Sequence, residues 1–174
     1  MIKNEKQYEY SQECARRFEY SIKSLEQDEE LKKKDPEGWQ LSRDVKQSHL
    51  IALQAEIAEY ERLINCNKSQ PIQITVESLN KLPDALIKAR IAAKMSKQEL
   101  AEILGIEEQR VKQYEETDYQ CASFVEILEV STVLGVEFAT AVVQVDFEEI
   151  EAAKQSAEKW RKEKVSTTSK PDKY

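Results

Sequence analysis

The stretch that decides the fold is KQELAEILGIEEQRVKQYE, which occupies residues 97–115 of a 174-residue chain. Ser96 precedes it and Glu99 follows three residues later, a capping-box pattern that begins a helix. Gly105 is predicted to end that helix. The residue after a helix often adopts the left-handed backbone conformation, which glycine adopts easily because it has no Cβ. A second helix then begins near Glu107. The stretch therefore predicts two short helices joined by a tight turn.

Two further helices flank this pair within residues 83–135. Pro83 suits a first helical turn, and the charge of Asp84 suits the positive end of the helix dipole. Ser123 and Glu126 repeat the capping box before the last helix, which Gly135 ends. The side chains predicted to face the core of this unit are Leu86, Ile87, Ala89, Ile91, Ala92, Leu100, Ala101, Ile103, Leu104, Ile106, Val111, Tyr114, Ile127, Leu128, Val130, Val133 and Leu134.

Residues 1–66 predict an antiparallel helical hairpin that forms an arm. Apolar residues recur at steps of three and four from Tyr8 to Leu25 and again from Leu50 to Ile64. A turn containing Pro36 lies between the two runs, so the helices should fold back on each other. The arm is interpreted as structural, with a dimerising or partner-binding surface as the alternative.

The remaining segments complete a mainly α chain with one short C-terminal strand and helix. Residues 67–82 are a connector, in which residues 71–76 predict a short strand or an extended segment. The β-branched run Val136–Val145 predicts a strand, and a helix should follow it. We expect this strand and helix, residues 136–165, to mediate dimerisation, and residues 166–174 to be a disordered tail.

Composition excludes several classes of function. Lys plus Arg number 26 and Asp plus Glu 33, giving a net charge of −7. The chain has no apolar run long enough for a membrane span or a signal peptide, so we expect a cytoplasmic protein with no membrane contact. Three widely spaced cysteines indicate free thiols. With His49 as its one histidine, the chain predicts no enzyme, no metal site and no cofactor.

The pattern Glu-Leu-Ala, three residues, Gly-Ile, four residues, Val within residues 97–115 resembles the XRE family of Cro-like and phage-repressor-like proteins. The resemblance covers about residues 82–136 and implies a lambda-repressor-like helix-turn-helix domain of four to five helices. The third helix of this domain, from about Glu107, would lie in the major groove of double-stranded DNA. The resemblance places base-facing or nearby side chains at Glu108, Gln109, Arg110, Lys112 and Gln113, and phosphate-contacting ones at Lys97 and Gln98. It also implies a structural ion pair between Arg90 and Glu115.

The arm narrows the resemblance to a subgroup that includes HigA-like antitoxins. The opening residues 2–8 and the stretch 82–91 are similar to members that carry an N-terminal helical arm. This similarity implies a homodimeric transcriptional regulator that represses its own operon and binds a cognate toxin protein. No chemistry is expected, only occupancy of an operator.

The net charge of the predicted helix-turn-helix region argues against simple DNA binding. Residues 71–135 contain seven Lys or Arg and eleven Asp or Glu, a net charge of −4. Phosphate contacts by basic side chains supply much of the affinity of DNA-binding proteins. The alternative is therefore a protein-interaction module, in which the helix-turn-helix is a scaffold and the hairpin binds a partner protein.

Overall fold

A computed structural model describes residues 1–67 and 69–168. The described residues form eight α-helices and one short 3₁₀ helix, with no strand among them. The protein is therefore mainly α, as predicted. The chain divides into two compact units, Met1–Glu137 and Phe138–Tyr174.

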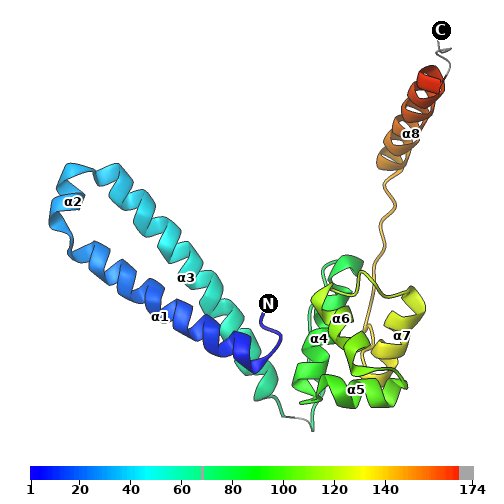
Figure 1. Ribbon diagram of the computed structural model, residues 1–174, viewed down its shortest axis with the longest axis horizontal. Helices are drawn as coiled ribbons and strands as arrows, with labels where there is room; N and C mark the ends of the chain where they lie inside the picture. The colour runs from blue at the N-terminus through cyan, green and yellow to red at the C-terminus, as the bar shows by residue number, and fades with distance from the viewer. Residues whose placement is uncertain (68, 169–174) are drawn as a thin grey trace, which may run out of the picture. The chain divides into compact units, whose positions relative to one another are not determined.

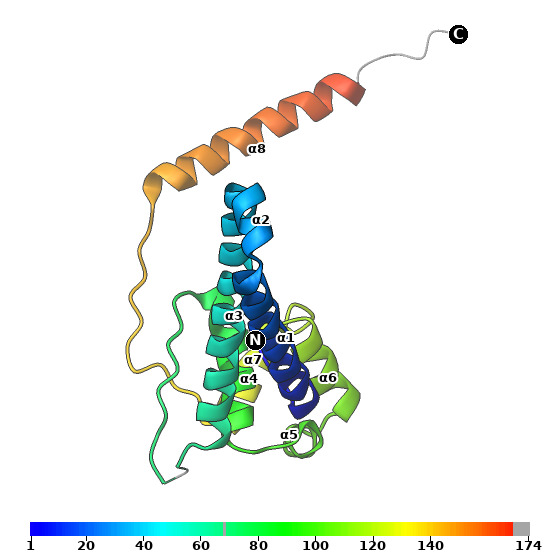
Figure 2. The ribbon, with the colours of Figure 1, turned by 90° about the vertical axis from the view of Figure 1, so that its left-hand side faces the viewer.

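The predicted N-terminal hairpin is present, and its tip is more ordered than a simple loop. Its elements are α1 (Glu5–Gln27), α2 (Glu29–Lys34) and α3 (Pro36–Ile64). The helices α1 and α3 lie side by side and run in opposite directions (Figures 1 and 2). The side chains of Asp28 and Asp35 each accept a bond from a backbone N–H three residues further on, so they cap α2 and α3. The six-residue helix α2 therefore forms the tip of the hairpin.

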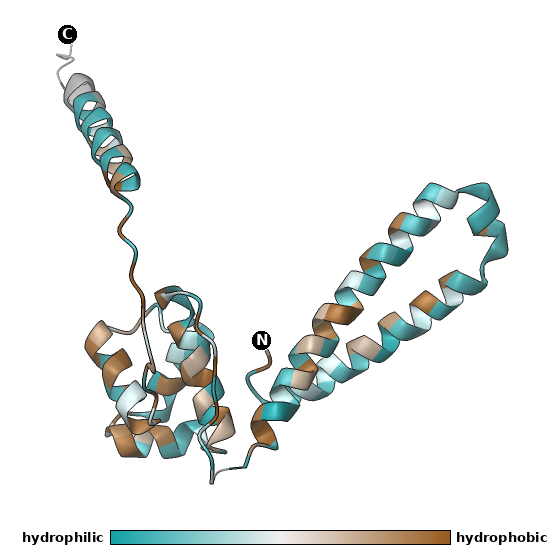
Figure 3. Ribbon diagram, turned by 180° about the vertical axis from the view of Figure 1, so that it is seen from behind, coloured by the Kyte–Doolittle hydropathy of each residue, from teal (hydrophilic) through white to brown (hydrophobic). Residues whose placement is uncertain are grey.

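The seam of the hairpin is the apolar stripe predicted from the sequence. Ala15, Ile22 and Leu50 are buried there, and Phe18 packs against them. The ring of His49, which is exposed, stacks on Phe18 at 5.6 Å between centroids, so the single histidine lies at the outer edge of the seam. Figure 3 shows apolar bands alternating with polar ones along both long helices, as expected when one stripe of each helix is buried.

Four short helices follow the hairpin within the first unit. They are α4 (Leu82–Ala92), α5 (Lys97–Leu104), α6 (Glu108–Glu116) and α7 (Phe124–Val133), preceded by the 3₁₀ helix η1 (Leu79–Lys81). Their fully buried side chains include Leu86, Leu100, Val111 and Tyr114, all of them predicted core residues.

Two predicted core residues of this four-helix group are instead exposed. Ile103 is 59% exposed and Leu128 is 49% exposed. A helix as short as α5 buries only one narrow side, here the side of Leu100 and Ala101, and Ile103 lies on the side away from Ala101. The helical period alone does not distinguish these positions.

The root of the hairpin shares one core with α4. Ile2, Tyr60 and Leu63 are buried in the same cluster as Leu82 and Leu86. The arm is therefore packed on the four-helix group by its root, rather than joined to it by the connector alone. The connector residues 71–76, predicted as strand or extended segment, have no regular secondary structure, and every second side chain among them is half-buried.

The strand predicted at Val136–Val145 is wrong. These residues form no ladder in the part of the chain that the structure describes, and Val142 and Val143 are each 84% exposed. A strand needs a neighbouring backbone to accept its hydrogen bonds, and β-branched composition does not supply one.

The helix predicted after this segment is present as α8 (Phe147–Thr168). The Asp146 side chain accepts bonds from the backbone N–H groups of Glu148 and Glu149, at 2.9 and 3.0 Å, and so caps it. The helix continues to Thr168, past the predicted start of the tail at residue 166. The rest of that predicted tail, residues 169–174, lies outside the described residues.

Candidate nucleic-acid interface

Local sequence chemistry determines where α5 begins and ends. The Ser96 hydroxyl accepts from the Glu99 N–H at 3.0 Å, while the Glu99 carboxylate accepts from the Ser96 N–H at 2.6 Å. Gly105 ends the helix with φ of +70°, and a Cβ there would meet no atom within 4 Å. The backbone conformation, rather than lack of space, therefore favours glycine at this turn. Helix α6 begins three residues later, at Glu108, with Glu107 as its N-cap.

A buried ion pair joins α4 to the end of α6. The pair expected between Arg90 and Glu115 is present: Arg90 Nη2 donates to Glu115 Oε2 at 2.9 Å, and Arg90 Nε also donates to this carboxylate. The two side chains are 8% and 1% exposed. Arg90 Nη1 donates to the Met95 carbonyl at 2.8 Å, and Lys97 Nζ lies 3.2 Å from Glu115 Oε2. One carboxylate thus links α4, α5 and α6.

A second network joins α6 to α7. The Tyr114 hydroxyl donates to Glu126 Oε1 at 2.6 Å, and Arg110 Nη2 donates to the same oxygen at 3.1 Å. Hydrogen bonds from Tyr114, from Ser123 and from Arg110 lower the pKa of Glu126 from 4.5 to about 2. The carboxylate also caps α7 through the Ser123 N–H at 2.6 Å. Sequence reasoning found the cap but missed the bond to Tyr114.

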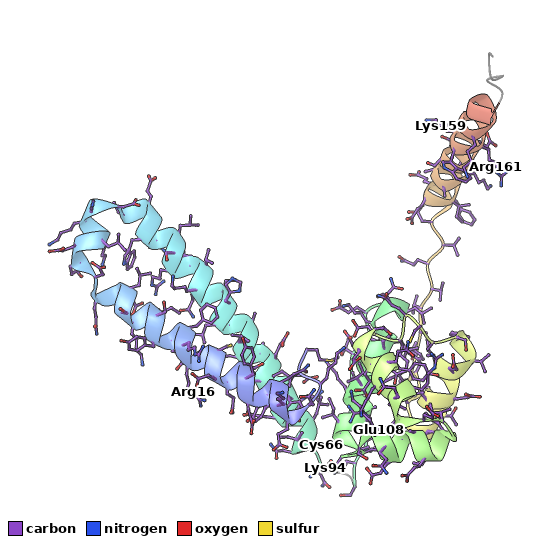
Figure 4. The ribbon with its side chains drawn as sticks, viewed as in Figure 1. Arg16, Cys66, Lys94, Glu108, Lys159 and Arg161 are labelled. Carbon is purple, nitrogen blue, oxygen red and sulfur yellow. The ribbon has the colours of Figure 1, made fainter. Side chains whose placement is uncertain are left out.

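The outer face of α6 presents amides and paired charges. Gln109 and Gln113 are exposed. Glu108, which Figure 4 labels, is half-buried at the start of the helix. Lys112 Nζ lies 2.9 Å from Glu108 Oε1, one helical turn earlier. Arg110 Nη1 donates to Gln113 Oε1 at 3.1 Å. The five residues predicted to face DNA therefore all lie on α6. Both cations among them, Arg110 and Lys112, are paired with carboxylates of the same chain.

The predicted phosphate contacts at the start of α5 are also engaged within the chain. Lys97 is paired with Glu115, and Gln98 donates to Glu102 Oε1 at 2.9 Å. All three basic residues of α5 and α6 thus lie within 3.2 Å of a carboxylate. Lys94, in the turn before α5, is exposed with φ of +54° (Figure 4). The face offers amide hydrogen bonding with little unpaired positive charge.

The N-terminus contributes contacts to α6 that sequence reasoning missed. Lys3 Nζ donates to the Glu115 carbonyl and lies 2.7 Å from Asp118 Oδ1. The amino group of Met1 lies 2.9 Å from Glu56 Oε1 on α3. Positions 3 and 115 are 112 residues apart, so no local pattern relates them. These residues tie the end of α6 to the arm.

Comparison with known proteins adds no assignment: no protein-family model matches the chain, and no curated protein and no solved structure matches it. Within residues 1–67 and 69–168, no group of three or more His, Cys, Asp or Glu side chains is arranged to hold a metal ion. None of the helices described is both long and apolar enough to cross a membrane.

Proposed function

We propose that residues 83–135 form a lambda-repressor-like helix-turn-helix domain of the XRE type, and that the protein is a sequence-specific DNA-binding transcriptional regulator. The observation that carries the proposal is the pair α5 and α6 with the left-handed Gly105 between them. The buried ion pair of Arg90 and Glu115 holds α6 against α4 and supports a defined orientation of α6. A rigidly held helix with an exposed polar face is what major-groove recognition requires.

In this proposal α6 reads bases and α5 contacts the backbone. The amides of Gln109 and Gln113 suit bidentate bonding to adenine, and Arg110 or Lys112 suits guanine. Lys97 and Gln98, at the N-terminal end of α5, would contact phosphates.

DNA binding has an electrostatic cost in this chain. Lys112 must exchange its bond to Glu108 for a contact to DNA. Glu108 can contribute only as an acceptor, for example from the amino group of cytosine. We therefore infer modest affinity per monomer and a homodimer that reads two half-sites, separated by one helical turn of DNA or a multiple of it.

We further propose, because of the arm, that the protein is the antitoxin of a toxin–antitoxin operon and represses that operon. Its partners would be the operator DNA and a cognate toxin protein. The packing of Ile2, Tyr60 and Leu63 into the core of the four-helix group supports a link between the two roles. A partner bound at the arm would contact an element that shares its core with α4, α5 and α6. It would change the affinity for DNA if it bound the DNA-bound and free states with different affinities.

The second candidate is a protein-interaction module, with the helix-turn-helix as scaffold. The observation that favours it is the pairing of Lys97, Arg110 and Lys112 with carboxylates of the same chain. Internal pairing leaves the net charge of −4 in residues 71–135 without a compensating basic face.

A salt titration of binding to the DNA upstream of the protein's own gene distinguishes the two candidates. The test variant combines Gln109→Ala with Lys112→Ala. The matched control combines Gln73→Ala with Lys81→Ala, which removes the same residue types from exposed positions outside α6. If α6 reads DNA, the test variant loses sequence-specific binding and the control keeps it. The slope of log affinity against log salt should also fall by about one for the lost lysine contact. No binding at low salt by the folded wild type supports the interaction module.

A further inference from the structure

Helix α3 carries a second, largely apolar stripe on the side away from the hairpin seam. Steps of four and three connect its members, which are Leu41, Val45, Ser48, Ala52 and Ala55, here named the outer stripe. All five are exposed, with Leu41 at 66% and Val45 at 48%. At 100° per residue these positions lie opposite the buried Leu50. No member is charged, although charged residues surround the stripe.

The spacing of the outer stripe is that of a two-helix seam. Alternating steps of four and three give a period of 3.5 residues, which keeps one stripe facing a partner helix. The stripe ends at Glu59, where the next member would fall. Its carboxylate already lies 2.7 Å from Arg62 Nε and 2.9 Å from Lys88 Nζ on α4. The uncharged stripe therefore lies on the part of α3 that projects away from the four-helix group.

We propose that the outer stripe is the interface with a second copy of this chain, with the two α3 helices antiparallel. The bulky members Leu41 and Val45 lie at one end, and the small members Ala52 and Ala55 at the other. An antiparallel arrangement centred between Val45 and Ser48 places Leu41 of one copy against Ala52 of the other. Large residues then face small ones, which fills the seam. A two-fold axis at this centre closes the assembly as a dimer.

The residues beside the outer stripe fit the same arrangement. In that register Ser42 faces His49 of the other copy, and Asp44 faces Ile51, so no two like charges are opposed. Ile51 is 56% exposed in the single chain, and the second copy would bury part of its side chain. In a parallel dimer each residue would face its own copy, and two Ala–Ala layers would leave the seam underfilled.

The second compact unit is one rival interface, because all its described side chains up to Trp160 are exposed. Val142 and Val143 there have no regular secondary structure. Ordering such residues on association costs conformational entropy. Helix α3 is already formed and packed on α1, so pairing through the outer stripe avoids this cost.

Sedimentation equilibrium of the full chain without DNA tests the interface. The variants are Ala52→Glu on the outer stripe and Ala153→Glu on α8, the same change at two exposed helical positions. The wild type should be a dimer. Ala52→Glu should raise the dimer dissociation constant about tenfold or more, since an unpaired carboxylate is buried, while Ala153→Glu should leave it unchanged. A monomeric wild type, or a dimer lost only in Ala153→Glu, would overturn the proposal. Circular dichroism checks that both variants remain helical.

Cysteine cross-linking tests the orientation. In a background with Cys14, Cys66 and Cys121 replaced by serine, Leu41→Cys plus Ala52→Cys should give a covalent dimer on oxidation. Leu41→Cys alone should not, because its antiparallel neighbour is residue 52. Self-cross-linking of the single variant would instead indicate a parallel pair and refute the arrangement. Both experiments omit DNA, so a failure of the proposed DNA binding would not affect their outcome.

Discussion

Replacing Glu115 by glutamine tests the buried ion pair that holds α6. The change keeps the shape of the side chain and removes its charge. The Arg90 guanidinium, whose side chain is 8% exposed, would then face a neutral amide at a buried site. Breaking a buried pair by neutralising one partner costs about 3–5 kcal/mol. Lys97 Nζ, 3.2 Å from the same carboxylate, also loses its partner, so we expect about 4 kcal/mol.

Urea unfolding followed by circular dichroism measures this loss. With a slope of about 2 kcal/mol per molar urea, the midpoint should fall by about 2 M. The control is Glu116→Gln, because the neighbouring carboxylate is exposed and its loss should change stability by less than about 0.5 kcal/mol. Arg90→Met combined with Glu115→Leu should recover much of the loss, since apolar groups of similar volume often replace buried ion pairs without penalty. A loss below about 1 kcal/mol for Glu115→Gln would show that the pair does not hold α6.

Three further substitutions test other parts of the same unit. The Tyr119 hydroxyl is buried and has no hydrogen-bond partner among residues 1–67 and 69–168. Tyr119→Phe should therefore raise the unfolding free energy by about 1 kcal/mol, and a lower melting temperature would contradict this. Gly105→Ala meets no steric contact but must adopt φ of +70°, so denaturant unfolding should show a loss of about 1 kcal/mol, whereas no loss would mean the turn relaxes. The pKa of Glu126 is lowered from 4.5 to about 2, so its stabilisation is complete above the unfolded pKa and disappears as pH falls toward 2. Glu126→Gln should therefore flatten this part of the curve of stability against pH, and an unchanged acid limb would argue against the bond to Tyr114.

Local patterns predicted the helices of the first unit well. Ser96 and Ser123 were identified as caps, and both form capping boxes. Gly105 and Gly135 were predicted to end helices, and both have positive φ. These features depend on atoms within four residues of one another, so a short stretch of sequence contains all the information that determines them.

Patterns that need a distant partner were less informative. The β-branched residues from Val136 to Val145 met the local preference for a strand, but no described backbone pairs with them. The motif residues of α5 and α6 were named from the sequence, whereas the sequence did not show that Lys97, Arg110 and Lys112 are each paired with a carboxylate. That pairing changes the expected charge of the candidate interface, and it depends on how α4, α6 and α7 pack together.

Sequence alone predicted the mainly α class, the hairpin and the helix ends, because helical periodicity and capping are local. The candidate DNA-reading side chains, in contrast, were named from a family resemblance. Only the tertiary structure placed Lys3 on the end of α6 and joined the root of the arm to the core of α4. It also showed that α3 buries one apolar stripe and leaves a second one exposed. The reason is that burial and charge pairing depend on which helices meet, and that is decided by contacts between residues far apart in the chain.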